Sequence, residues 1–314
     1  MNLLSNIYGS VVATRNALYD RGVLRARRLQ GAVISVGNLS TGGSGKTPFV
    51  ILLGELLQNR GIPFDVLSRG YGRTTRGVLH VDPTGSSEQF GDEPLLIARR
   101  LQVPVIVGED RYRAGCFAES KFGPQLHLLD DGFQHRALAR DFEIVLVSPD
   151  DAADQLLPTG RLREPVSALH RADAIVFTFA RPEGLFSEFG KPIWRAHRTI
   201  VPRNVPQQPV VFCGIARPQK FALQLRLSGV QPVAEAFFRD HHRYVAKDIQ
   251  DLLQLKQRSC AGGFVTTEKD AINLGPNISQ LQPLSVVPLE MRLDNSANAV
   301  DTILRTIDER KGKA

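Results

Sequence analysis

Short apolar runs recur along the first two thirds of the chain and alternate with segments of helical periodicity. The runs show little polar alternation, which is the pattern of strands buried on both faces of a parallel sheet. We predict strands at residues 32–36, 64–67, 103–107, 126–129, 144–147 and 174–179. We predict helices at residues 49–59, 94–101, 114–121 and 166–171. Strands that alternate with helices indicate an α/β fold with a mainly parallel sheet flanked by helices.

The alternation is interrupted at residues 201–209, a proline-rich segment typical of a linker, and then restarts. The restarted pattern predicts strands at 210–214, 233–238 and 264–267 and helices at 219–227, 247–256 and 297–309. We therefore expect a second, smaller α/β domain. The expected division is an N-terminal helical segment in residues 1–30, a large domain in 31–204 and the smaller domain in 205–314.

An amphipathic segment opens the chain, with Leu3, Leu4, Ile7, Tyr8 and Val11 at helical spacing and five arginines between residues 15 and 28. This arrangement suits a helix in the interface of an anionic membrane. It suits equally a helix that packs its apolar stripe on the body of the protein. No stretch approaches the ~20 apolar residues of a membrane span, and a basic region ahead of the apolar stretch, as in secretory signals, is lacking.

The composition is that of a globular protein, with 42% hydrophobic residues, 23% charged residues and a formal net charge of +7. The basic excess indicates an anionic partner. A nucleic acid is disfavoured, because the basic residues lack interleaved aromatic residues, and no protein partner is predicted. The three cysteines form no CxxC pair, so we expect neither a disulfide framework nor a zinc site, and a reducing compartment fits best.

A glycine-rich segment lies between the predicted strand 32–36 and the predicted helix 49–59. It consists of Ser40, Thr41, Gly42, Gly43, Ser44, Gly45, Lys46 and Thr47. Its glycines let backbone N–H groups approach a phosphate, and the following helix directs its positive end at the same anion. In a phosphate-binding loop (P-loop), Lys46 would hold the phosphates of ATP and Thr47 would ligate Mg²⁺. The alternative is an ordinary glycine-rich turn. One departure from the common P-loop pattern is Ser40, which stands where that pattern begins with glycine.

Two adjacent carboxylates, Asp130 and Asp131, end the predicted strand 126–129. An acid at the end of a buried strand is typical of the carboxylate that binds Mg²⁺ in P-loop enzymes. The sequence does not distinguish which of the two would meet the metal. Taken alone, Asp131 and Gly132 also read as a simple chain reversal. The upstream glycine-rich segment favours the metal-binding interpretation.

Asp92 precedes Pro94 at the start of a predicted helix and reads first as a helix cap. A carboxylate at this place would also suit the base that accepts a proton from an attacking hydroxyl group. In the second domain, Asp240 is followed by His241 and His242. This group is either structural or a contribution to metal or acid–base chemistry.

Charged side chains in loops supply the candidate substrate-binding residues. Arginines in such loops clamp phosphates bidentately or form surface ion pairs of little consequence. Two polar residues that follow Asp131 lie within reach of the same site. The candidates are Arg69, Arg111, Gln134, His135, Arg163 and Glu164.

A set of segments in this chain resembles the tetraacyldisaccharide 4′-kinase family of lipid A biosynthesis. The matching segments are residues 35–48, 67–73, 91–94, 109–112, 129–136, 157–165, 240–241 and 266–270. They occur in the family's order and cover about residues 1–270. The serine at position 40 is usual in this family. The combination is specific, whereas each segment alone is not.

The resemblance implies a P-loop kinase that uses ATP and Mg²⁺ to phosphorylate the 4′-hydroxyl of a tetraacyldisaccharide 1-phosphate, giving lipid IVA. It implies a peripheral protein at the cytoplasmic face of the bacterial inner membrane, with a glycolipid substrate and an anionic membrane surface as partners. Asp92 aligns with the family's catalytic aspartate and His241 with the histidine that pairs with it. Lys46 would assist phosphoryl transfer, and the N-terminal stripe would dip into the membrane interface.

Two other functions fit parts of the pattern. A membrane-associated regulatory P-loop ATPase would hydrolyse ATP without forming a phosphorylated product. A GTP-binding module would need an Asn-Lys-x-Asp segment to read the base, and the nearest string, residues 268–270, has the wrong spacing.

Overall fold

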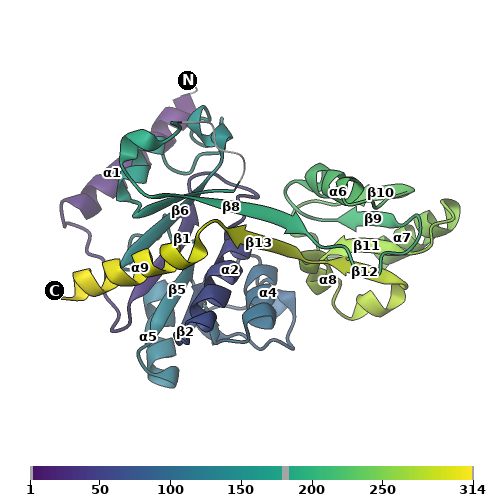
Figure 1. The fold of residues 1–314 in the computed structure, drawn as a ribbon, viewed down its shortest axis with the longest axis horizontal. Helices are drawn as coiled ribbons and strands as arrows, with labels where there is room; N and C mark the ends of the chain where they lie inside the picture. Colours follow the sequence, from purple (N-terminus) through teal and green to yellow (C-terminus); the bar gives the residue numbers. More distant parts are fainter. Residues whose placement is uncertain (1–2, 179–183, 313–314) are drawn as a thin grey trace.

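The computed structural model describes residues 3–178 and 184–312. Figure 1 shows a large body that contains both ends of the described chain and a smaller body beside it, with β8 and β13 running between them. Each body is built around its own sheet.

The large sheet has nine strands in the order β13-β8-β7-β6-β1-β5-β2-β4-β3. The strands are β1 Val33–Asn38, β2 Phe64–Ser68, β3 Leu79–His80, β4 Val105–Val107, β5 Leu126–Asp130, β6 Phe142–Val147, β7 Ala174–Phe177, β8 Ile193–Ile200 and β13 Leu289–Leu293. All neighbours pair in parallel except at the two edges, where β13 pairs with β8 and β3 with β4 in antiparallel fashion.

Helices cover both faces of this sheet. They are α1 Leu3–Asp20, α2 Lys46–Asn59, α3 Ser87–Phe90, α4 Asp92–Leu101, α5 Arg111–Phe122 and α9 Ser296–Lys311, with the short 3₁₀ segments η1 Pro149–Ala152, η2 Val166–Arg171 and η3 Ser187–Phe189. Within β1, Ile34 and Val36 pack with α2, α4 and α9, whereas Val33 faces the opposite core with α5. Burial on both faces explains the apolar runs without alternation.

The small sheet has four parallel strands in the order β10-β9-β11-β12. Its elements are β9 Val210–Cys213, α6 Pro218–Leu227, β10 Ala234–Phe237, α7 Ala246–Arg258, β11 Phe264–Thr267, α8 Glu268–Leu274, η4 Gly275–Gln280 and β12 Leu284–Val287. The predicted fold class is therefore confirmed: a mainly parallel α/β sheet flanked by helices, with a second, smaller α/β unit.

The end of the chain corrects the predicted range 205–314 of the smaller domain. β13 pairs with β8 in the large sheet, and α9 buries Ala299, Ile303 and Ile307 in the same core as α2. The apolar face of a helix predicts that the helix packs on a core, but the sequence does not show which of the two cores it packs on. The limits at residues 30 and 204 stay predictions.

Four strands were not predicted from the sequence: β3, β8, β12 and β13. Of these, β8 and β13 carry polar residues between apolar ones and lack an unbroken apolar run. In β8, for example, Trp194 and Ala196 are buried while Arg195 and His197 are not. The predicted strand 174–179 ends at Phe177 in the structure, and its last residue lies outside the described residues. The predicted helix 166–171 is the 3₁₀ segment η2.

A buried ionic cluster at the amino ends of β2 and β5 predicts a pH-dependent stability. His127 Nδ1 lies 2.8 Å from Asp65 Oδ1, and Nε2 lies 3.3 Å from Glu119 Oε1. Burial lowers the pKa of His127, but the bonds to Asp65 and Glu119 outweigh it and raise the pKa above its usual 6.5. This contribution to stability is therefore full below about pH 6.5 and is lost as the pH rises through the raised value.

We expect the free energy of unfolding of the wild type to exceed that of Asp65→Asn most at low pH, with a difference that shrinks above about pH 6.5. Urea titrations across this range measure it. The control is Asp251→Asn on the exposed face of α7, which should give a flat difference. A flat difference for Asp65→Asn would contradict the prediction.

Candidate functional site

The glycine-rich segment forms a loop between the end of β1 and the start of α2. Gly42, Gly43 and Gly45 have φ values of 80°, 50° and 89°. Residues with a side chain rarely adopt this left-handed conformation, so the sequence needs glycine at these positions. The loop thus has the strand–turn–helix setting of a P-loop and differs from an ordinary turn by leading directly into a helix N-terminus.

Side chains from β8 and from the small unit lie over this loop. Arg198 of β8 donates hydrogen bonds of 3.3 Å to the carbonyl oxygen of Gly43. A Cβ atom added to Gly45 would lie 1.9 Å from Arg198 Nη2, and one added to Gly43 would lie 3.5 Å from both Ala216 and Arg217. Burial, together with the charge of Arg217, lowers the pKa of Arg198 to about 10. This accumulation of positive charge suits a polyphosphate ligand.

Lys46 and the end of β5 form a second part of the site. Lys46 Nζ donates to Asn38 Oδ1 at 3.0 Å and lies 3.5 Å from Asp131 Oδ1. Arg163 makes a bidentate ion pair with Asp131, with distances of 2.8 and 3.1 Å. Burial would raise the pKa of Asp131, but Lys46 and Arg163 lower it far below its usual range. Asp131 is therefore ionised and already engaged by two cations.

Asp130 has a different environment from its neighbour. Its side chain is buried, Oδ2 accepts a hydrogen bond of 3.0 Å from Ser68, and Oδ1 is buried with no partner among the described residues. Burial and the charges of Glu93 and Asp131 raise the pKa of Asp130 to about 7. A buried carboxylate oxygen without a partner is costly and indicates a missing cation or donor.

The residues present fit Mg²⁺ at this place. Thr47 and Asp130 are both buried and both line one cleft, and hydroxyl and carboxylate oxygens are the ligands that Mg²⁺ prefers. The described residues contain no cluster of three His, Cys, Asp or Glu side chains that could hold a metal. Magnesium at nucleotide sites needs only one or two carboxylates because phosphates and water complete its shell.

Asp92 and His241 meet across the two units. Asp92 is the first residue of α4 and 4% exposed, whereas His241 follows β10 with a left-handed φ of 58°. His241 Nδ1 lies 2.9 Å from Asp92 Oδ2, and Asn273 Nδ2 donates to the same oxygen at 3.2 Å. Burial raises the pKa of Asp92, but the bond to His241 and the charge of Lys269 lower it overall, so the carboxylate stays ionised.

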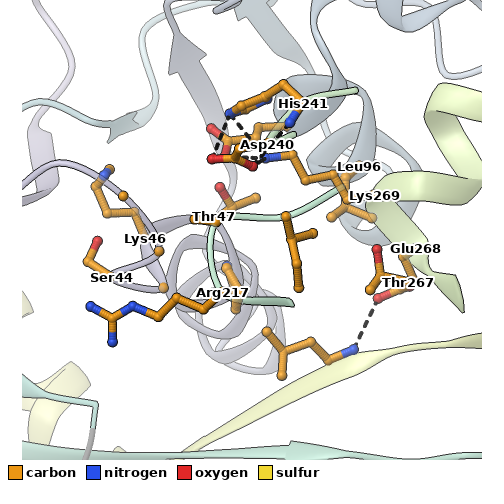
Figure 2. Close-up of a pocket in the computed structure, with 18 of the residues that line it drawn as sticks. Ser44, Lys46, Thr47, Leu96, Arg217, Asp240, His241, Thr267, Glu268 and Lys269 are labelled. Carbon is orange, nitrogen blue, oxygen red and sulfur yellow. Dashed lines mark hydrogen bonds and ion pairs between the residues drawn. The ribbon is translucent and has the colours of Figure 1, made fainter. Parts of the chain in front are cut away.

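A cleft of about 820 Å³ lies between the loop and His241, and the buried Asp92 contacts His241 without lining the cleft itself. In Figure 2, His241, Asp240 and Lys269 lie together near the top and Lys46 and Ser44 lie at the left. The cleft is lined by all eight residues of the predicted loop and by Asp130, Asp131, Arg69, Arg163 and His241. Residues far apart in the sequence thus converge on one cavity, as in most ligand sites.

Four predicted substrate-binding residues do not line this cleft. Arg111 is buried and donates to the carbonyl oxygen of Glu109, and Gln134 donates to that of Asn38. His135 is half-buried, and burial lowers its pKa to about 4. The buried carboxylate of Glu164 is bound by Arg171 of η2 and by Asn16 of α1.

Several residues of the cleft were absent from the predicted set. Glu93 and Lys269 line it near His241, and Arg198, Arg217 and Lys220 line it near the loop. Lys269 lies in the segment 266–270 that carried the family resemblance, and that signal pointed to it. Arg198 and Arg217 lie in segments without such a motif.

The N-terminal helix α1 packs with a polar face and leaves its apolar stripe uncovered. Ser5 and Tyr8 donate hydrogen bonds to the carbonyl oxygens of Leu156 and Arg163, respectively. Leu3, Leu4, Ile7 and Val11 are 53–72% exposed. Packing of the stripe on the body, one of the two interpretations left open by the sequence, is therefore wrong for these four residues, whereas Tyr8, the fifth residue of the stripe, does contact the body. Within residues 3–178 and 184–312, no helix is long and apolar enough to cross a bilayer.

Comparisons with known proteins agree with this geometry. Residues 1–308 match the family model described as tetraacyldisaccharide-1-P 4′-kinase. The tetraacyldisaccharide 4′-kinase of Koribacter versatilis (strain Ellin345) is 51% identical over 322 residues, 99% of this chain and 100% of that protein. That of Aquifex aeolicus (strain VF5) is 40% identical over 257 residues, 76% and 81% of the two chains.

A solved structure shares the fold. It is the crystal structure of the "apo" form of LpxK from Aquifex aeolicus in complex with ATP, which matches with a TM-score of 0.79 and 33% identity over 97% of each chain.

The loop geometry predicts that Gly45→Ala weakens binding of a nucleoside triphosphate at least about tenfold. Alanine at this φ is strained by roughly 1–2 kcal/mol, and its Cβ would displace Arg198. Titration calorimetry measures the affinity. The matched control is Gly61→Ala, which has a φ of 66° but nothing within 4 Å, and should lower stability without changing affinity. Equal affinities of the two variants would contradict the prediction.

Proposed function

This chain belongs to the tetraacyldisaccharide-1-P 4′-kinase family, and we propose on this premise that it transfers the γ-phosphoryl group of ATP to the 4′-hydroxyl of a tetraacyldisaccharide 1-phosphate. One observation carries the proposal. His241, whose Nδ1 lies 2.9 Å from Asp92 Oδ2, and the loop that ends at Lys46 and Thr47 line a single cleft between the two units. A kinase needs a base that accepts the proton of the hydroxyl group and a binding site for the triphosphate.

On the nucleotide side, backbone N–H groups of the loop and the N-terminus of α2 bind the phosphates. Lys46 leaves its contact with Asp131 to neutralise charge on the transferring group. Thr47 and Asp130 would hold Mg²⁺, which would supply further positive charge at the phosphates. Asp131 remains paired with Arg163, so Asp130 is the ligand that we assign to the metal.

On the acceptor side, Asp92 accepts the proton of the sugar hydroxyl group as the oxygen attacks phosphorus. His241 fixes the orientation of the Asp92 carboxylate through its Nδ1 contact. Arg69 and Arg163 line the cleft and bind anionic or polar groups of the substrate. Arg111 places a positive charge near Asp131, and Gln134 donates to the carbonyl oxygen of Asn38 at the end of β1. Glu164 ties the loop that carries Arg163 to α1.

The test is incubation of the protein with γ-labelled ATP and the disaccharide lipid in detergent, followed by chromatography of the products. We expect labelled glycolipid from the wild type, and Asp92→Ala should retain ATP binding while losing about 10²–10⁴-fold in kcat. Asp82→Ala is the control, because this acid is exposed and accepts hydrogen bonds from its neighbour Thr84.

Two results would count against the proposal. Inorganic phosphate as the sole labelled product would favour a regulatory ATPase. A wild-type rate for Asp92→Ala would refute the assignment of the base.

We further propose that α1 holds the protein at the cytoplasmic face of the inner membrane as a peripheral protein. A lipid with four acyl chains stays in the bilayer, so the enzyme must approach it there. The exposed stripe of α1 offers apolar side chains to the interface, and the arginines after it offer charges to anionic lipids.

Replacement of Leu4, Ile7 and Val11 by serine should abolish most binding to anionic vesicles in a flotation assay, because it removes apolar area from the interface. Activity on detergent-dispersed substrate should remain. The control is Leu227→Ser on α6, a site that is 79% exposed in the small unit. Undiminished flotation of the triple variant would refute this role of α1.

A further inference from the structure

Lys269 stands out among the residues that the mechanism above does not use. It is the second residue of α8 in the small unit, and its side chain is only 16% exposed. Burying an ammonium group is costly unless its partners are close. Its partners come from both units: Nζ lies 3.4 Å from Glu93 Oε1, 3.6 Å from Asp92 Oδ2 and 3.6 Å from Asp240 Oδ1.

The nearest group to Lys269 Nζ is the ring of His241. Nζ lies 3.2 Å from Nε2, while the other ring nitrogen, Nδ1, lies 2.9 Å from Asp92 Oδ2. An ammonium group can only donate, so Nε2 must present its lone pair. The single proton of the neutral ring is then on Nδ1, where it is donated to Asp92.

We propose that Lys269 is a positioning residue that fixes the tautomer of neutral His241 and opposes protonation of the ring, and through both sets the basicity of Asp92. The inference rests on the proposed function. A neutral imidazole orients the carboxylate by one hydrogen bond, whereas an imidazolium would draw on its negative charge and make it a weaker base. Lys269 therefore acts on the proton acceptor without contacting the reacting atoms.

The groups around His241 have opposite effects on the pKa of its ring. Burial and Lys269 lower the pKa of His241, whereas Asp92 and Glu93 raise it, and the net effect is a rise. Asp240 Oδ2 lies 3.8 Å from Nε2, and the ring of Tyr71 packs at 5.2 Å. Without Lys269 only burial would oppose the carboxylates, so the ring would stay protonated to a higher pH. The pKa of Asp92 would rise as well, because Lys269 also lowers it.

Both effects move in the same direction, which gives a clear test. In Lys269→Met the acidic limb of the profile of kcat/KM against pH should shift upward by at least about half a unit. The KM for ATP should change little, because the contacts of Lys269 lie on the acceptor side of the cleft. Lys269→Arg keeps the positive charge and should keep the limb close to that of the wild type. Lys247→Met, at an exposed position of α7, is the control for removing a positive charge.

A second measurement does not depend on how well the variants fold. In wild-type protein with ¹⁵N-labelled histidine, the two ring nitrogens of His241 should show the pattern of an Nδ1–H tautomer. The signal is identified by its absence in His241→Gln. An Nε2–H tautomer, or an unshifted limb in Lys269→Met, would overturn the proposal, as would equal shifts in Lys269→Met and Lys269→Arg. These outcomes can be interpreted only if the wild-type protein labels the glycolipid. If the wild type forms no labelled glycolipid, the proposed kinase function is refuted, and not only the role of Lys269.

Discussion

The parallel pairing of β1, β5 and β2 is the constraint on which the site depends. These strands are neighbours in the large sheet, so their carboxyl ends lie side by side at one edge. The glycine loop follows β1, Asp130 and Asp131 end or follow β5, and Arg69 follows β2. The local sequence explains each segment separately. Only the pairing of the strands brings the proposed phosphate-binding loop and the two carboxylates together.

The small unit supplies polar residues that the edge of the large sheet lacks. His241 and Lys269 come from loops and helices of the small sheet, yet their polar atoms meet Asp92 at the start of α4. β8 and β13 hold the two units at this distance, because both are strands of the large sheet and both lead directly into the small one. The same strand β8 brings Arg198 over the loop. The proposed acid–base pair and the proposed phosphate-binding loop are thus both reached through the same strand.

Hydrogen bonds link the N-terminal helix α1 to the loop that carries Arg163. Tyr8 and Asn16 contact residues 163 and 164, and Arg163 in turn grips Asp131. The residues that α1 buries are Ser5 and Val12, whereas Leu3, Leu4, Ile7 and Val11 of its apolar stripe are exposed. The helix that we propose to meet the bilayer therefore also supports a loop that lines the cleft.

Local chemistry in the sequence determined the fold class, the loop from Ser40 to Thr47 and the acids at the end of β5, because apolar runs, glycines and strand ends have physical causes within a few residues. The motif resemblance paired Asp92 with His241. Only the tertiary structure decided that α9 returns to the large core, that two cations contact Asp131 while Asp130 Oδ1 has no partner among the described residues, and that Lys269 meets His241. Those outcomes depend on contacts between residues distant in sequence, which no local pattern encodes.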